Sequence, residues 1–155
     1  EPLEDMSLVL VGKPTQYYEE IKRYCEAHNL SERVQLLSGV SMEELAIIYQ
    51  LATVFCYPSV FEGFGIPIIE ALFSKTPIIT SKGSCFPEAG GAHSIYVNLD
   101  RAATEIREAI VNIITYEALR TTMITEGYHY AQRFTDEAVF QELMKVYNQV
   151  SGIRG

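Results

Sequence analysis

The chain has 155 residues, of which 48% are hydrophobic and 21% are charged, and its formal net charge is −8. This length suits one domain that buries about 70% of the surface that its unfolded chain exposes. The negative charge argues against nucleic acid and anionic lipid as partners, because both attract cationic proteins, so a small molecule is the expected ligand.

The first third of the chain predicts two strands that alternate with helices. An apolar run at residues 7–12, ending in glycine, is typical of a buried parallel strand. Pro14 follows at the start of a predicted helix. Residues 34–37 predict a second strand, and Ser41 with Glu44 forms a capping box at the start of the next helix.

The middle of the chain predicts three further strands, at residues 53–57, 77–80 and 94–97. A helix over about 66–74 separates the first two of these strands. After the fifth strand the pattern is wholly helical. Thr135 is expected to cap the last helix, which carries an apolar stripe comprising Phe140, Leu143 and Tyr147.

The alternation of strands and helices predicts one α/β domain, a Rossmann-like parallel sheet with helices on both faces. In such sheets ligands bind beyond the carboxyl ends of the strands. Four of the predicted loops follow strands, so we expect them to gather at one edge of the sheet.

The run from Phe61 to Ala71 has the character of a binding site. It follows a predicted strand and leads into a helix, where Pro67 suits the first turn. Gly63 and Gly65 allow a sharp turn and a close approach of the backbone to a ligand. The N–H groups of Gly63, Phe64 and Gly65 would lie at the positive end of the helix, which is a natural seat for phosphate.

Two glutamates bracket this turn, Glu62 just before it and Glu70 about one turn inside the helix. Because phosphate repels carboxylates, their expected partners are hydroxyl groups on either side of the phosphates. This arrangement matches a nucleotide sugar, which has hydroxyls at one end, a diphosphate in the middle and ribose hydroxyls at the other end. A glycine turn with two solvated glutamates is the alternative interpretation.

The sequence Glu-Gly-Phe-Gly-Ile-Pro-Ile-Ile-Glu-Ala at 62–71 resembles the hallmark of the retaining glycosyltransferases of family 4, whose two glutamates are separated by seven residues. The resemblance covers nearly the whole chain. It extends to residues 38–52, to the Pro-Glu-x-x-Gly loop at 83–91 and to the segment 127–147. It implies the carboxyl-terminal, donor-binding half of a GT-B fold in an enzyme similar to mannosyltransferases.

The resemblance also implies roles for single residues. Glu62 would be the catalytic residue and contact hydroxyls of the transferred sugar, while Glu70 would accept hydrogen bonds from the ribose. Gly39 and Val40 are candidates for lining the base, with a plain turn before a capped helix as the alternative. Glu88, in the small-residue loop, either faces the sugar or is solvated.

One departure from the family concerns the start of the chain. The family's donor domain usually begins with an earlier strand and helix, and we expect residues 1–155 to lack both, together with the amino-terminal acceptor domain. We expect no metal site and no cofactor besides the donor substrate. Cys25, Cys56 and Cys85 are odd in number and without C-x-x-C spacing, which favours buried free thiols.

The expected function is transfer of a hexose, with mannose as one candidate, from a nucleotide diphosphate sugar to a saccharide or lipid-linked acceptor in glycan biosynthesis. A non-catalytic module that binds a nucleotide or nucleotide sugar is the alternative. Neither a signal peptide nor the ~20 consecutive apolar residues of a membrane span is evident. We therefore expect a cytoplasmic protein, peripheral to the membrane only through the acceptor half. A dinucleotide oxidoreductase is disfavoured, because Ile68 stands where its third glycine would be.

Overall fold

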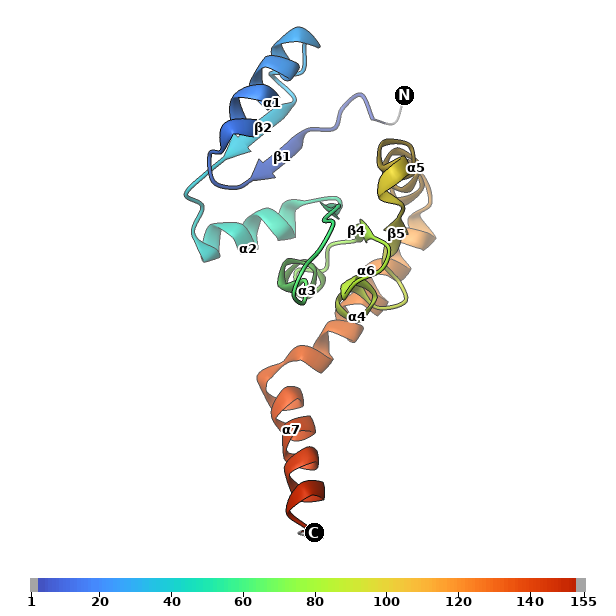
Figure 1. Cartoon of the computed structure of the whole chain (residues 1–155). Helices are drawn as coiled ribbons and strands as arrows, with labels where there is room; N and C mark the ends of the chain where they lie inside the picture. The colour runs from blue at the N-terminus through green and yellow to red at the C-terminus, as the bar shows by residue number, and fades with distance from the viewer. Residues whose placement is uncertain (1–2, 153–155) are drawn as a thin grey trace. The chain divides into compact units, whose positions relative to one another are not determined.

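The computed structural model describes residues 3–152. They divide into two compact units, with the boundary between Ile47 and Ile48, inside helix α2 (Met42–Leu51). Figure 1 shows that both units combine strands and helices, and every strand pair is parallel. The predicted α/β class with parallel, Rossmann-like packing is confirmed.

In the first unit a helix connects two parallel strands. Strand β1 (Leu8–Val11) pairs with β2 (Val34–Leu37) over its whole length, and α1 (Gln16–Ala27) lies between them in the sequence. The expected burial of β1 is wrong, because Leu8 is 49% and Val11 43% exposed. A two-stranded sheet has too few neighbours to enclose a strand on both faces.

The capping box at the start of α2 is confirmed. The Ser41 N–H donates to Glu44 Oε2 at 2.8 Å, and the Glu44 N–H donates to Ser41 Oγ at 3.2 Å. The two bonds satisfy donors that the first turn of a helix leaves unpaired.

The second unit contains a three-stranded parallel sheet in the order β3 (Phe55–Tyr57), β4 (Ile78–Ser81), β5 (Ile95–Val97). All four residues of the central strand β4 are buried, so side chains cover both faces of this sheet. Helix α3 (Ile66–Phe73) connects β3 to β4. Helix α4 (Phe86–Gly90), between β4 and β5, replaces part of the loop that the sequence predicted.

Three longer helices follow β5: α5 (Ala102–Thr115), α6 (Glu117–Ala131) and α7 (Asp136–Ser151). Helices α5 and α6 pack against the sheet and complete the core of this unit. The core cluster combines residues of β4, β5, α5 and α6: Ile79, Val97, Ala109, Ile113 and Met123.

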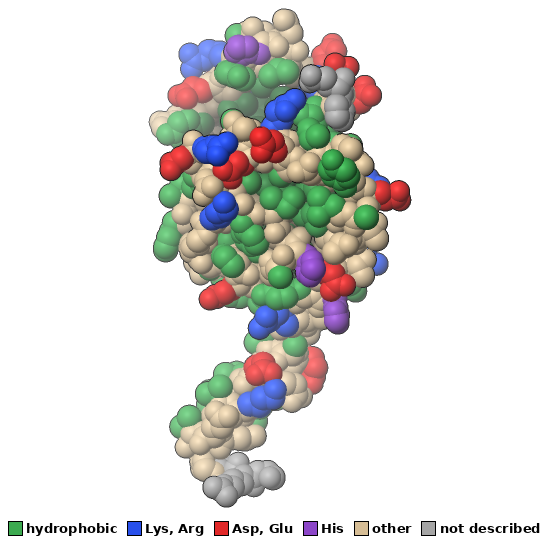
Figure 2. All heavy atoms as spheres, turned by 90° about the vertical axis from the view of Figure 1, so that its right-hand side faces the viewer, with side chains coloured by type: hydrophobic (Ala, Val, Ile, Leu, Met, Phe, Trp, Pro, Cys, Tyr) green, Lys and Arg blue, Asp and Glu red, His purple; other side chains and the backbone are tan. Residues whose placement is uncertain are grey.

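Helix α7 continues beyond the sheet of the second unit (Figure 1) and contributes no buried residue. The predicted cap is confirmed, since the Ala138 N–H donates to Thr135 Oγ1 at 3.3 Å. Its apolar stripe is exposed, with Phe140 at 53%, Leu143 at 50% and Tyr147 at 60%. Figure 2 shows hydrophobic and charged side chains interspersed along this helix. None of the helices within residues 3–152 combines the length and the hydrophobicity needed to cross a membrane.

Candidate functional site

The loop between β3 and α3 carries most of the predicted site, and buried side chains fix its backbone. Two side chains from β4 and one just before α4 each donate to a backbone carbonyl of this loop or of the last residue of β3: Thr80 Oγ1 to Tyr57 O (2.8 Å), Ser81 Oγ to Ser59 O (2.6 Å) and Cys85 Sγ to Glu62 O (3.4 Å). Thr80 and Ser81 are at most 1% exposed. The parallel pairing of β3 with β4 therefore determines where this loop runs.

Glu62 lies in this loop with one carboxylate oxygen occupied. Its Oε1 accepts from the Tyr57 hydroxyl at 2.7 Å and from Ser59 Oγ at 2.9 Å. Both bonds stabilise the ionised form and hold the pKa of Glu62 below its ordinary value. Burial and the bond to Glu62 raise the pKa of Tyr57 to about 12, so its hydroxyl remains a donor at neutral pH. No group among residues 3–152 donates to Oε2 of Glu62, so this oxygen has capacity for a further hydrogen bond.

The turn Gly63–Gly65 presents backbone donors. Gly65 is buried and adopts a left-handed conformation with φ of 88°, where it forms the N-cap of α3. Within residues 3–152 the N–H groups of Gly63, Phe64 and Gly65 donate to no other backbone carbonyl. These adjacent donors precede the positive end of α3, so together they favour an anion.

Glu70 lies on α3, and one of its oxygens is also occupied. The hydroxyl of Tyr49, on α2, donates to Glu70 Oε2 at 3.1 Å. Tyr49 is 6% exposed, and its burial together with the charge of Glu70 raises the pKa of its hydroxyl well above the ordinary value. Glu70 Oε1 has no donor among the described residues and has capacity for a further hydrogen bond.

This loop and the helix after it therefore combine two carboxylates, each with one available oxygen, and a set of backbone donors between them in the sequence. Carboxylate oxygens accept hydrogen bonds from hydroxyl groups, and the backbone donors suit phosphate. Tyr49, Tyr57 and Ser59 escaped the sequence analysis. The available signal was the pair of hydroxyl residues Thr80 and Ser81, which follow two isoleucines in β4 and supply buried donors.

Gly39 and Val40, predicted to line the base, belong to the first unit. Gly39 has a φ of 70°, and a Cβ built there would meet no atom within 4 Å. Val40 is half-buried. Their contact with a base stays a prediction.

Glu88 lies on the short helix α4 and is exposed. Its backbone carbonyl accepts from the Tyr130 hydroxyl at 2.7 Å, which connects α4 to α6. The prediction of a loop around Glu88 is wrong, because residues 86–90 form a helix. Phe86, which is 0% exposed, anchors this helix in the core.

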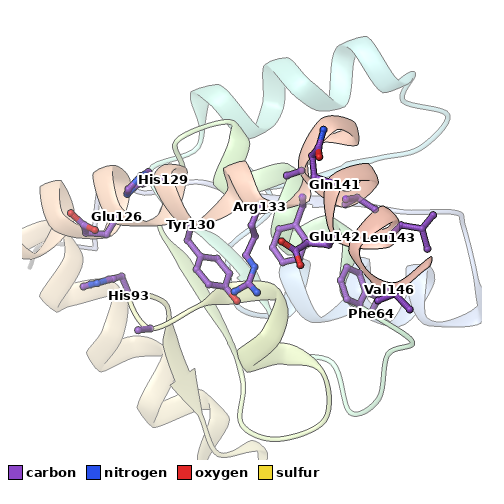
Figure 3. Close-up of a pocket in the computed structure, with 14 residues that line it drawn as sticks. Phe64, His93, Glu126, His129, Tyr130, Arg133, Gln141, Glu142, Leu143 and Val146 are labelled. Carbon is purple, nitrogen blue, oxygen red and sulfur yellow. The ribbon is translucent and has the colours of Figure 1, made fainter. Parts of the chain in front are cut away.

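A hollow of about 1080 Å³ lies elsewhere in the second unit, between α6, α7 and the turn after α4 (Figure 3). Phe64 lies in the loop between β3 and α3 (residues 58–65), called the motif loop from here on, and lines this hollow. The Phe64 ring meets the Phe134 ring edge-on, with 5.7 Å between the ring centroids. Leu143 and Val146 of α7 line the same hollow as Phe64 (Figure 3). Glu62 and Glu70 are not among its lining residues, so this hollow shares only Phe64 with the predicted site.

The three cysteines are free. Cys25 is buried, and burial raises the pKa of the Cys56 thiol to about 11, which keeps it protonated and unreactive at neutral pH. Cys85 is half-buried and donates to the motif loop. Within the described residues no three His, Cys, Asp or Glu side chains gather into a potential metal site.

A parallel α/β unit with a glycine turn ahead of a helix belongs to the Rossmann-like class of proteins. A profile described as "Glycosyl transferases group 1" matches residues 2–130, so the chain belongs to this family. The match is consistent with the carboxyl-terminal domain of these enzymes.

Individual relatives agree with the family. The O-antigen chain mannosyltransferase RfbU of Salmonella typhimurium is 38% identical over 97 residues, which is 63% of this chain and 28% of that protein. The structure of sucrose-phosphate synthase from Thermosynechococcus elongatus superposes with a TM-score of 0.77 at 27% identity, over 96% of this chain and 39% of that chain. HepE from Anabaena, in complex with UDP and glucose, has the same fold, with a TM-score of 0.80 at 19% identity over 92% of this chain and 40% of that chain. The chain thus spans less than half the length of each of these proteins.

Proposed function

We propose that residues 1–155 are the donor-binding part of a retaining glycosyltransferase that acts in glycan biosynthesis. The donor is a nucleotide diphosphate sugar, and the acceptor is a saccharide or a lipid-linked saccharide. Mannose is the favoured hexose, because several relatives are named mannosyltransferases. A nucleotide sugar as donor is supported by the structure of HepE, which is a complex with UDP-glucose.

One observation carries the proposal: each motif glutamate has one oxygen occupied by a tyrosine and one oxygen available. Glu62 accepts from hydroxyls of the transferred sugar, and Glu70 accepts from the ribose hydroxyls. The backbone N–H groups of Gly63, Phe64 and Gly65 contact the diphosphate between them. Each group thus meets the part of the donor whose charge and hydrogen-bonding capacity it complements.

The chemistry assigned to this chain is positioning and charge stabilisation. Negative charge grows on the leaving diphosphate as the glycosidic bond to it breaks, and the donors ahead of α3 stabilise that charge. A pair of carboxylates acting as in glycosidases is disfavoured, because a carboxylate nucleophile and a phosphate seat require opposite local potentials.

The test compares three variants by calorimetry after a thermal-shift screen of UDP-, GDP- and ADP-sugars and the free nucleoside diphosphates. Glu70→Gln weakens binding of both ligand types by about 1–2 kcal/mol, because a charge-assisted bond to the ribose becomes neutral. Glu62→Gln weakens binding of the nucleotide sugar alone. Glu108→Gln, at an exposed position of α5, is the matched control and changes neither affinity.

Unchanged affinity of both ligands in Glu70→Gln rejects the ribose contact, and equal losses in Glu62→Gln reject the sugar contact. The retaining mechanism is tested separately by proton NMR of the first product formed from a donor of known anomeric configuration. An inverted product contradicts it.

The second candidate is a module that binds a nucleotide sugar without turnover. The same residues support it, since every contact assigned above is a binding contact. Release of nucleoside diphosphate by the full-length protein, dependent on acceptor and abolished in Glu62→Gln, excludes this candidate.

A further inference from the structure

Three aromatic rings connect the two motif glutamates inside the second unit. Tyr49 on α2 meets Phe55 edge-on, with 5.0 Å between ring centroids. Phe55 stacks on Tyr57 at 5.8 Å with an interplanar angle of 21°. Phe55 and Tyr57 are two positions apart on β3, so their side chains leave the strand on the same face. We refer to Tyr49, Phe55 and Tyr57 as the aromatic row.

Each end of the aromatic row is a hydroxyl that donates to one glutamate. Tyr49 donates to Glu70 Oε2 at 3.1 Å, and Tyr57 donates to Glu62 Oε1 at 2.7 Å. Tyr49 on α2 and Glu70 on α3 are 21 residues apart in the sequence, so their hydrogen bond connects two separate helices. In both carboxylates the tyrosine occupies one oxygen and thereby orients the other.

The backbone on either side of the row is itself anchored. Thr76 Oγ1 donates to the carbonyl of Tyr49 at 2.6 Å, and Thr80 Oγ1 donates to the carbonyl of Tyr57 at 2.8 Å. Both threonines are at most 2% exposed. A hydroxyl buried without a partner is costly, so these bonds restrict the movement of the two tyrosines.

We propose that Tyr49 and Tyr57 are positioning residues that fix the orientation and the mutual distance of Glu70 and Glu62, with Phe55 as the ring contact between them. This inference rests on the function proposed above. An ionised carboxylate has only acceptor oxygens, so the oxygen that each tyrosine leaves available accepts from the ligand. The two ends of the site therefore select hydroxyl groups over carbonyl or anionic oxygens.

The test uses the full-length protein and the variants Tyr49→Phe and Tyr57→Phe, which remove one oxygen each. Tyr96→Phe is the matched control, because the Tyr96 hydroxyl also donates to a single acceptor, the Gly91 carbonyl, at 2.6 Å. Thermal unfolding of all three variants is recorded first. Affinities are then measured by calorimetry for UDP and GDP, for their 2′,3′-dideoxy counterparts, and for UDP-glucose and GDP-mannose.

The expected pattern differs between the two variants. Tyr49→Phe weakens binding of the nucleoside diphosphates and nucleotide sugars roughly three- to tenfold and leaves the dideoxy ligands unchanged, because only ribose hydroxyls contact Glu70. Tyr57→Phe weakens binding of the nucleotide sugars by a similar factor and leaves the nucleoside diphosphates unchanged. Tyr96→Phe changes none of these affinities.

A general loss of structure lowers all affinities by one factor, and that result overturns the inference. It is also overturned, with the proposed function intact, if Glu62→Gln and Glu70→Gln weaken binding but the tyrosine variants bind like the wild type. If the two glutamine variants bind every ligand as the wild type does, the proposed function fails, and the positioning role fails with it.

Discussion

The two glycines of the motif loop differ in what a side chain would meet. At Gly65 the φ of 88° is strained for any other residue, and an added Cβ would lie 3.2 Å from Ala89 Cβ. At Gly63 φ is not positive, and an added Cβ would meet no protein atom within 4 Å. The fold therefore requires glycine at position 65, whereas at position 63 the protein itself leaves room for a side chain.

Gly65→Ala is expected to destabilise the protein by about 1–3 kcal/mol through its left-handed backbone and the contact with Ala89. Gly63→Ala is expected to leave the free energy of unfolding within about 0.5 kcal/mol of the wild type. It should still weaken binding of the nucleoside diphosphate, because the methyl group separates the backbone from the phosphates. Chemical denaturation and calorimetry on both variants measure these effects. Normal affinity in Gly63→Ala argues against a close approach of the ligand.

The charge state of Glu62 depends on its donors. Bonds from Tyr57 and Ser59 depress its pKa in the folded protein. A depressed carboxyl pKa contributes stability above the unfolded-state value, and this contribution is lost as the pH falls through the folded value. The carboxylate thus stays ionised, and competent to accept hydroxyls, to a lower pH than an ordinary glutamate.

Tyr57→Phe is expected to move the titration of Glu62 upward, toward the ordinary value, since one stabilising donor is removed. The carboxyl carbon chemical shift of Glu62, followed by NMR from pH 2 to 7, measures it. Tyr96→Phe serves as the reference, because the Tyr96 hydroxyl donates to the Gly91 carbonyl and not to Glu62. A downward or absent shift in Tyr57→Phe contradicts the assigned cause.

At the scale of the elements, helices that look alike in sequence differ in what they bury. Helices α5 and α7 both carry regular apolar stripes. Ile113 of α5 is 0% exposed in the core cluster, but Leu143 of α7 is 50% exposed. Periodicity shows which face of a helix is apolar, and it carries no information about whether another element covers that face.

Ile113→Ala is expected to cost about 2–5 kcal/mol in the free energy of unfolding, through lost burial and a residual cavity. Leu143→Ala, the same type of truncation on α7, should cost no more than about 0.5 kcal/mol. Urea denaturation followed by circular dichroism compares the two. A Leu143→Ala cost as large as that of Ile113→Ala means that the stripe is covered in solution.

Most elements were predictable from local signals, because strands and helices of this kind follow apolar periodicity and caps. Strand β2 has the predicted bounds, and the caps at Ser41 and Thr135 form as expected. Strand β4 ends at Ser81, one residue later than predicted. Helix α4 escaped prediction because its five residues are too few for a periodic pattern, and tertiary packing of Phe86 decides its conformation.

The candidate site was predictable only where its residues are contiguous. The motif loop reveals Glu62, the glycines and Glu70, since their roles follow from spacing along one turn. The hydrogen bond from Tyr49 to Glu70 crosses from α2 to α3, and the chain direction of two separate elements decides such a contact. The chain has ten tyrosines, and residue spacing alone does not indicate which of them donates to Glu70.

At the scale of the whole molecule, the net charge of −8 opposes the approach of an anionic donor. Local donors in the motif loop act over about one helical turn, whereas the overall charge acts over a Debye length of roughly 10 Å at 0.1 M salt. Long-range repulsion and short-range attraction therefore affect different steps of binding.

The association rate constant for UDP-glucose or GDP-mannose is expected to rise for residues 1–155 as salt increases from 0.02 to 0.2 M, because screening reduces the repulsion. Stopped-flow fluorescence at constant pH measures it. An uncharged competitor of similar size provides the reference for viscosity and specific-ion effects. A rate that falls with salt indicates that positive charge near the site dominates the approach.

The bonds from Thr80 to the end of β3 and from Ser81 and Cys85 to the motif loop also have a consequence for the thermodynamics of recognition. They order the loop during folding, so the donor meets a backbone that is already in place. Ordering a residue costs roughly 1–2 kcal/mol in conformational entropy, and here that cost falls on folding instead of association. Nucleotide binding should therefore show a heat-capacity change no larger than the ligand contact area requires, without the excess that accompanies coupled folding.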